Sequence, residues 1–184
     1  GSTLLVASPP PNAVIYYSSA GQPTGVRARG LSALLDGGIE FSPNGQKLWI
    51  ASFGSNQVVE HDAASGALLR SFQSVCGLLP TDVAYGPDGK LYVACLGDNG
   101  VSRIDLATGQ SLGAFVLGGS GGLQSPRSLV FGPDGKLYVS SSTGEVLRYD
   151  GTTGDFAGVF VDAGGKGRGP VGALGHRFLS GRLV

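Results

Sequence analysis

Residues able to do acid–base or metal chemistry are few in this 184-residue chain, which has two histidines and 13 acidic residues. Glu40 is the most unusual acid, because it interrupts the apolar segment from Ile39 to Phe41. A buried carboxylate needs a partner, and such exceptions are often found at functional sites. The alternative, which we favour, is that Glu40 points into a solvated channel. The roles of His61 and His176 depend on the elements that carry them.

Those elements belong to a sequence repeat. The turn glycines Gly45, Gly89 and Gly135 are separated by 44 and 46 residues, and Gly181 follows 46 residues later. A period of this length is typical of repeat architectures such as β-propellers.

Each repeat contains signals for two tight turns. Pro-Asn-Gly or Pro-Asp-Gly joins an apolar segment to Leu-Trp-Ile or Leu-Tyr-Val, and these residues favour a β-hairpin. A second turn has an aspartate four residues before a glycine, in the pairs Asp62–Gly66, Asp105–Gly109 and Asp150–Gly154. Each period of about 45 residues therefore predicts four short antiparallel strands, which make one propeller blade.

The repeat also predicts the core. Three aromatic residues share one repeat position, three leucines share the position before it, and three phenylalanines lie farther along each repeat: Trp49, Tyr92 and Tyr138; Leu48, Leu91 and Leu137; Phe72, Phe115 and Phe160. We expect these side chains to pack between adjacent blades.

Composition excludes several functional classes. The chain is 41% hydrophobic and 14% charged, which favours a packed domain over a disordered one. Thirteen basic residues balance thirteen acidic ones, so no overall field attracts nucleic acid or an anionic membrane. No apolar run approaches the roughly 20 residues that span a bilayer, so we expect no membrane insertion.

The repeat assigns positions to the histidines and cysteines. His61 aligns with Tyr17, Ile104 and Tyr149 in the third strand, so we interpret it as structural; His176 falls near a turn, and we expect it to be exposed. Cys95 ends a strand, whereas Cys76 lies in the loop before the preceding strand. The two are either a disulfide or separate buried thiols, and we favour separate thiols.

Three asparagines share one repeat position just before the third strand: Asn12, Asn56 and Asn99. Turn capping explains them better than ligand binding, although Asn56 and Asn99 remain candidates for a binding surface. Arg127, at the start of a predicted innermost strand, is a candidate for lining the central axis.

The repeats resemble the NHL and YVTN class of β-propellers, especially those of exported bacterial proteins and streptogramin-lyase-like propellers. The resemblance rests on "GPDGKLYV" at 86–93 and 132–139, on "NQVVEHD" from Asn56 and on "VLRYDGTTG" from Val146. It covers nearly the whole chain and implies the architecture. Propellers host enzymes, binders and scaffolds alike, so it says little about function.

The resemblance also suggests what an enzymatic site would need. Streptogramin lyases use histidine with a metal, and no matching histidine cluster is present here. Gluconolactonase-like propellers bind a divalent ion through acids and asparagines near the axis. Glu40, Asp36, Asp82 and Asp98 would imitate that metal site only if they converge, and they do not share a repeat position.

The repeat boundaries predict a single all-β domain over 1–184, a propeller of about four blades. The units are about 1–34, 35–79, 80–125 and 126–169, and a closing strand within 170–184 completes the first blade. "GRLV" at 181–184 matches another second strand and has no place in such a ring. The units therefore either close within one chain or join a larger assembly by donating a strand.

We expect a non-enzymatic exported propeller that acts as a binding or structural module at the cell surface or outside the cell. Its partner is a protein, a glycan or another copy of itself, and no cofactor is expected. The alternative is a metal-dependent lyase or lactonase built on the same fold.

Overall fold

A computed structural model describes residues 4–8, 13–18, 20–28, 37–73, 75–164, 178–179 and 182–183. Apart from two single-turn 3-10 helices, η1 (Phe53–Ser55) and η2 (Ser120–Gly122), the regular structure described is β-strand. The described strands form one three-stranded sheet, three four-stranded sheets and one two-stranded sheet, all antiparallel. The expectation of an all-β fold with four-stranded antiparallel sheets is confirmed.

Within each sheet the strands follow one another in sequence order. The three-stranded sheet comprises β1 (Leu4–Ser8), β2 (Ala13–Tyr17) and β3 (Pro23–Ala28). The next comprises β4 (Ile39–Phe41), β5 (Lys47–Ser52), β6 (Gln57–Asp62) and β7 (Leu68–Gln73). It is followed by β8 (Pro80–Tyr85), β9 (Leu91–Cys95), β10 (Gly100–Ile104) and β11 (Ser111–Val116). The last four-stranded sheet comprises β12 (Leu129–Phe131), β13 (Leu137–Ser140), β14 (Val146–Tyr149) and β15 (Phe156–Val161).

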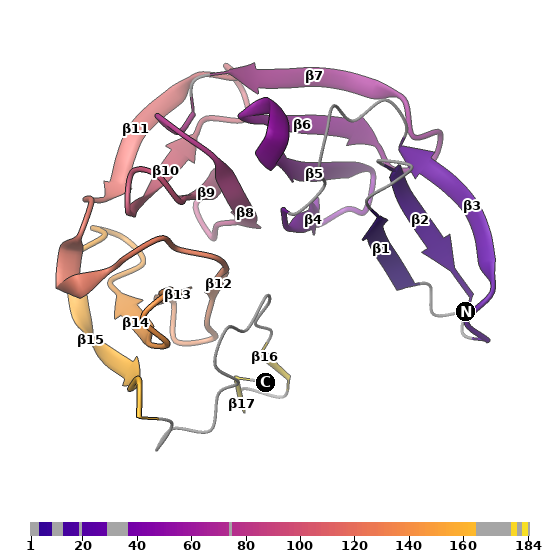
Figure 1. Cartoon of the computed structure of the whole chain (residues 1–184). Coiled ribbons are helices and arrows are strands. Elements are labelled where there is room, and N and C mark those ends of the chain that lie inside the picture. Colours follow the sequence, from indigo (N-terminus) through magenta and orange to yellow (C-terminus); the bar gives the residue numbers. More distant parts are fainter. Residues whose placement is uncertain are drawn as a thin grey trace.

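The sheets stand side by side around an open arc (Figure 1). Strands β4, β8 and β12 lie nearest the middle of the arc, and β7, β11 and β15 lie on its outside. Each sheet therefore has an inner edge, an outer edge and two faces that meet the neighbouring sheets, as a propeller blade does.

The turns form for the reasons that the sequence suggested. Gly45, Gly89 and Gly135 have φ of 69°, 79° and 74°, a region that disfavours residues with a Cβ. The Oδ1 atom of Asp88 accepts the backbone N–H of Lys90 at 3.2 Å and so closes the first turn. The same turn chemistry recurs in each four-stranded sheet, which fixes the register of the hairpins.

Large side chains fill the space between neighbouring sheets. Trp49 stacks on Tyr85 of the next sheet, with ring centroids 5.7 Å apart, and Tyr92 meets Phe131 edge to face at 4.8 Å. The aromatic and leucine positions predicted for the core are all buried. Trp49, Tyr92 and the three leucines pack between neighbouring sheets as predicted, whereas Tyr138 packs with Val146 and Val161 of its own sheet. Phe72 and Phe115 are also buried, but Phe160 is 43% exposed.

The end of the chain forms a short hairpin. Strand β16 (Phe178–Leu179) pairs with β17 (Arg182–Leu183) as a separate two-stranded sheet, so part of the surplus "GRLV" segment is a strand. Of residues 170–184, to which we assigned the closing strand, the structure describes only 178–179 and 182–183.

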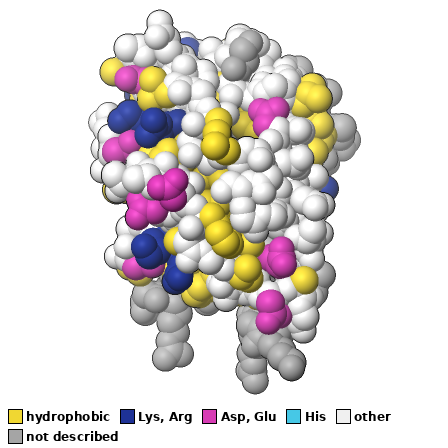
Figure 2. Space-filling view, turned by 90° about the vertical axis from the view of Figure 1, so that its left-hand side faces the viewer, with side chains coloured by type: hydrophobic (Ala, Val, Ile, Leu, Met, Phe, Trp, Pro, Cys, Tyr) yellow, Lys and Arg dark blue, Asp and Glu magenta, His cyan; other side chains and the backbone are white. Residues whose placement is uncertain are grey.

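The outer strands expose several apolar side chains. Leu112 on β11 and Val159 on β15 are 43% and 50% exposed. On the side of the molecule where β11 and β15 lie, apolar atoms alternate with charged groups of both signs (Figure 2). In the part of the chain that the structure describes, no helix has the length and hydrophobicity of a membrane span.

Candidate functional site

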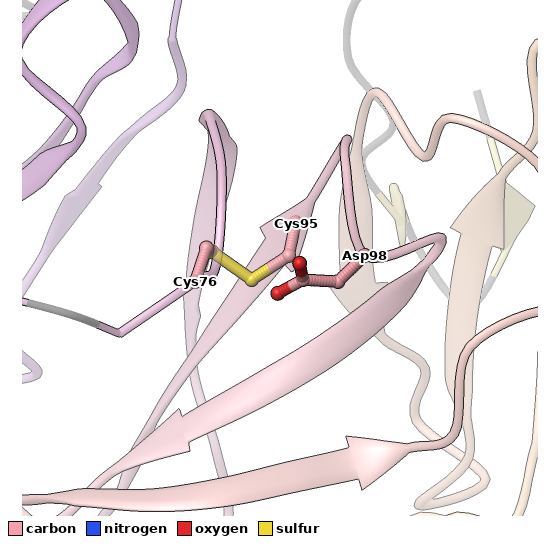
Figure 3. A group of neighbouring side chains, drawn as sticks. All are labelled: Cys76, Cys95 and Asp98. Atoms are coloured by element: carbon pink, nitrogen blue, oxygen red, sulfur yellow. A yellow bond between two sulfur atoms is a disulfide. The ribbon is translucent and has the colours of Figure 1, made fainter.

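The clearest cluster of reactive side chains lies where the loop before β8 meets the end of β9. Cys76 and Cys95 are joined by a disulfide, with their Cα atoms 5.4 Å apart (Figure 3). Our preference for two separate thiols was therefore wrong. Residues 75–79 fold back onto β9, and Pro80 lies opposite Cys95 in the strand register, so the two cysteines become neighbours.

Asp98 completes this cluster. Its carboxyl oxygen and the two sulfur atoms lie within 4.8 Å of one another, and its Oδ2 accepts the backbone N–H of Gly77 at 2.7 Å. Asp98 is exposed, whereas both cysteines are buried. Metal ions bind thiolates rather than disulfide sulfurs, so the oxidised cluster does not offer two thiolate ligands.

Asp82 lies at the start of the innermost strand β8 and bridges three sheets. Its Oδ2 accepts the hydroxyl of Ser128 and the N–H of Leu129 from the next sheet, both at 2.9 Å. On the other side, a Cβ added at Gly38 would overlap Asp82 Oδ1, so the absence of a side chain at Gly38 makes room for the carboxylate. Part of the Asp82 residue stays accessible, but protein atoms enclose its carboxyl group. This enclosure raises the pKa of Asp82 to about 6, against the opposing effect of its hydrogen bonds.

The acids considered as a metal site do not converge. Glu40 is on β4, opposite Trp49 in the register, and is partly exposed. Asp36 lies outside the described residues. Among the residues that the structure describes, the one group of three potential ligands with atoms close together is that of Cys76, Cys95 and Asp98, which includes neither Glu40 nor Asp82.

Asn56 and Asn99 link neighbouring sheets. Both have left-handed backbones, with φ of 54° and 51°. The Oδ1 atom of Asn56 accepts the N–H of Leu79 at 2.6 Å, and that of Asn99 accepts the N–H of Ser125 at 2.7 Å. In each case the acceptor holds the loop that enters the next sheet, which supports the structural interpretation. Asn12 lies outside the described residues.

Arg127 and the histidines have different surroundings. Arg127 is exposed just before β12, and its backbone N–H donates to Ser140. His61 is buried, and its Nδ1 lies 3.0 Å from the carbonyl oxygen of Gly66, so its structural role agrees with the prediction. His176 lies outside the described residues.

Sequence reasoning missed a buried charge network around Glu60. Its carboxylate is 2% exposed and accepts hydrogen bonds from Trp49 Nε1 at 2.7 Å, from Lys47 at 3.0 Å and from Arg70 at 3.0 Å. Burial favours the protonated form, but these hydrogen bonds, the one from Arg70 largest, hold the pKa of Glu60 below its usual range. Arg70 also donates to the carbonyl of Leu106 at 2.7 Å, so the network ties two sheets together.

The fold is that of the β-propellers typified by strictosidine synthase-like proteins and virginiamycin B lyase. The family model "Strictosidine synthase-like, N-terminal" matches residues 106–149. The chain is similar to Kuenenia stuttgartiensis hydrazine synthase, with a TM-score of 0.70 and 21% identity over 87% of this chain and 46% of that one. It is also similar to virginiamycin B lyase from Staphylococcus aureus, with a TM-score of 0.61 and 18% identity over 80% of this chain and 48% of that one.

At these identities the similarity shows the fold alone. The chain spans less than half the length of either solved chain. No curated protein matches the chain in sequence.

Proposed function

We propose that the chain is a non-enzymatic propeller module of the NHL and YVTN type, which binds a protein or glycan partner or another copy of itself. The observation that carries this proposal is that the candidate ligand groups already have structural partners. Asp82 is bonded to Ser128 and Leu129, Asn56 and Asn99 hold the loops of neighbouring sheets, and Asp98 is bonded to Gly77. Side chains engaged in this way stabilise the sheets and are poorly placed to bind a substrate.

The disulfide supports an exported location. Disulfides persist mainly in oxidising compartments such as the periplasm or the extracellular space, and Cys76–Cys95 joins two buried residues between a loop and a strand. The proposed location is therefore extracellular or at the cell surface.

The number of sheets in the complete ring is also part of the proposal. Four repeat units with a C-terminal strand completing the first would make a ring of about four blades. In the described structure the sheets form an open arc, and β16 pairs with β17 in a sheet separate from that of β1 (Figure 1). The proposal keeps both forms, in which the units either close into a ring within one chain or join a larger assembly by donating a strand.

The competing function is a metal-dependent lyase or lactonase. The virginiamycin B lyase from Staphylococcus aureus is an enzyme by name, and Glu40 on β4 and Arg127 just before β12 retain accessible surface. A metal site of this kind would need other ligands close to Glu40, because the described group of Cys76, Cys95 and Asp98 does not include it.

Metal binding separates the two functions. Thermal unfolding is followed with EDTA and then with Ca²⁺, Mg²⁺, Mn²⁺ and Zn²⁺, and turnover of a lactone and of virginiamycin B is measured with each ion. We expect no metal-dependent rise in Tm, no turnover, and saturable binding to a glycan array or a purified surface protein. A rise in Tm and turnover that are both lost in Glu40→Gln would overturn the proposal.

A further inference from the structure

The loop that carries Cys76 is held beside the end of β9 by hydrogen bonds that do not involve sulfur. Leu96 donates its backbone N–H to the carbonyl oxygen of Leu79 at 3.0 Å. From the preceding sheet, Oδ1 of Asn56 accepts the N–H of Leu79 at 2.6 Å. Breaking the S–S bond removes neither contact, so the two cysteines remain neighbours in the reduced chain.

The carboxyl group of Asp98 points toward the two sulfur atoms (Figure 3). One of its oxygens and the two sulfurs lie within 4.8 Å of one another. Its Oδ2 accepts the backbone N–H of Gly77 at 2.7 Å, whereas among the described residues Oδ1 has no hydrogen-bond partner. Asp98 is exposed, so the group has an unused carboxylate oxygen and a side that water can reach.

The repeat does not require these residue types. Ser52 and Ser55 occupy the positions of Cys95 and Asp98 in the preceding sheet, where Ser55 Oγ donates to Ser52 Oγ at 2.7 Å. Small hydroxyl residues are therefore sufficient to form this turn. In the sheet of β8–β11 the same two positions carry a sulfur and a carboxylate, and Cys76 adds a second sulfur. The disulfide accounts for the two cysteines, but not for the carboxylate that faces them.

We propose that the reduced chain binds Zn²⁺ through the sulfurs of Cys76 and Cys95 and the carboxylate of Asp98, with water as the fourth ligand. Zinc sites of this kind have metal–ligand distances of about 2.3 Å to sulfur and about 2.0–2.2 Å to oxygen in tetrahedral geometry. The ligand atoms then lie about 3.5–3.8 Å apart. Once the S–S bond is broken, the two sulfurs are free to separate to that distance.

The donor set selects the metal. Two thiolates disfavour Ca²⁺ and Mg²⁺, which take oxygen ligands, and a carboxylate with an open water position suits Zn²⁺ better than Cu⁺. This inference goes beyond the proposed function, because it assigns a site that exists only when the disulfide is reduced.

Zinc and the disulfide exclude each other. Reduction adds two electrons and two protons to the S–S bond, and zinc then displaces the two protons from the thiols. In the reverse direction, a small-molecule disulfide takes two electrons from the thiolates and two protons from solvent, becomes two thiols, and leaves the protein disulfide and free Zn²⁺. Because this exchange needs a free thiolate, bound zinc should protect the pair from oxidation.

The test compares the reduced and the untreated chain, with Co²⁺ as a spectroscopic probe. A water-soluble phosphine reduces the disulfide, becomes a phosphine oxide with an oxygen atom from water, and is removed by anaerobic gel filtration. We expect the reduced chain to bind one Co²⁺ with thiolate charge-transfer absorption and the visible bands of a tetrahedral site, and Zn²⁺ to displace it. No saturable binding by the reduced chain, or equal binding by the untreated chain, overturns the proposal.

Asp98→Asn tests the carboxylate, because asparagine keeps an oxygen for the N–H of Gly77 but carries no charge. Loss of a group that only supports a ligand already costs about 10–100-fold, so the Kd for Co²⁺ should rise at least about tenfold. Asp162→Asn is the matched control: Asp162 is also exposed and accepts a backbone N–H, that of Gly164 at 3.0 Å, and its variant should keep the wild-type Kd. An unchanged Kd in Asp98→Asn would mean that any cysteine pair, even in an unfolded chain, binds the metal equally well, and would contradict the site.

Oxidation kinetics provide an independent readout. At a Zn²⁺ concentration about nine times the Kd, about one tenth of the chain is free, so disulfide formation by oxidised glutathione should slow about tenfold. The same Zn²⁺ concentration should protect Asp98→Asn less, and an unchanged wild-type rate would overturn the proposal. The test of the proposed function uses the chain with its disulfide intact, so that function and this site can fail separately.

Discussion

The indole nitrogen of Trp49 donates a 2.7 Å hydrogen bond to Oε2 of Glu60, and both side chains are only 2% exposed. The indole N–H and the carboxylate each need a partner when buried, and each provides it for the other. Lys47 and Arg70 supply the compensating positive charge from the edge of this pair. The contact thus joins the aromatic core of the sheet to a charge network that reaches the next sheet.

Replacing Glu60 with glutamine should lower the free energy of unfolding by about 1–3 kcal/mol at neutral pH, because Arg70 and Lys47 lose their buried counter-ion. The pKa of Glu60 is lowered in the folded state, so its contribution is present above its ordinary pKa and is lost as pH falls through the folded value. The difference between wild type and variant should therefore shrink as pH falls below 4.5, the ordinary pKa of a glutamate. Urea denaturation at several pH values measures it.

Glu145→Gln is the control for Glu60. Glu145 is partly exposed at a turn and accepts a bond from Thr143, so its substitution should change stability by less than about 0.5 kcal/mol. An equal loss in both variants would mean that the buried network does not stabilise the fold.

Asp82 should make the protein less stable as pH rises through the acidic range. Its pKa is raised to about 6 from 3.8, so between these values the folded state holds a proton that the unfolded state releases. The free energy of unfolding contributed by Asp82 therefore falls as pH rises from about 4 to about 6 and then levels off. Denaturation of Asp82→Asn over this range should lack that fall, whereas Asp155→Asn, at an exposed turn, should retain it. A wild-type profile parallel to that of Asp82→Asn would contradict the assignment.

Removing the disulfide should cost about 3 kcal/mol, because Cys76 and Cys95 are 19 residues apart and their bond restricts the unfolded chain. Denaturation with and without a dithiol reductant measures this loss, and thiol titration of the denatured protein counts the free sulfhydryls. The double variant Cys76→Ser and Cys95→Ser should be as unstable as the reduced protein and insensitive to the reductant. Two free thiols in the untreated protein would disprove the bond.

The features predicted correctly from the sequence depend on local chemistry or on the repeat. Pro-Asx-Gly determines a hairpin within a few residues, and the shared position of Trp49, Tyr92 and Tyr138 indicates a common burial. The disulfide was missed because it depends on a loop that Asn56 and Asp98 hold through long-range hydrogen bonds. Aligning the repeats shows where the loop occurs in the sequence, but it does not show how the loop folds back onto β9.

Glu60 was missed because it departs from the repeat. Arg103 and Arg148 stand at its position in the other sheets, and Gly113 and Gly158 stand where this sheet has Arg70. In the sheet of β4–β7 the arginine is therefore on the fourth strand, and a carboxylate occupies the third-strand position that is an arginine in the other two sheets. Comparing charges between repeats, rather than searching for apolar positions alone, would have revealed the pair.

The last prediction separates the two roles of Asn56, which are to adopt a left-handed backbone and to hold Leu79. Asn56→Gly keeps the backbone but loses the 2.6 Å hydrogen bond, and it should cost about 1 kcal/mol. Asn56→Ala loses the bond and also strains a residue with φ of 54°, so it should cost about 2–3 kcal/mol. Gly144, which has φ of 94° at the same repeat position, shows that glycine is tolerated there. Urea denaturation of both variants measures the difference, and an alanine variant as stable as the glycine variant would show that the backbone conformation carries no cost.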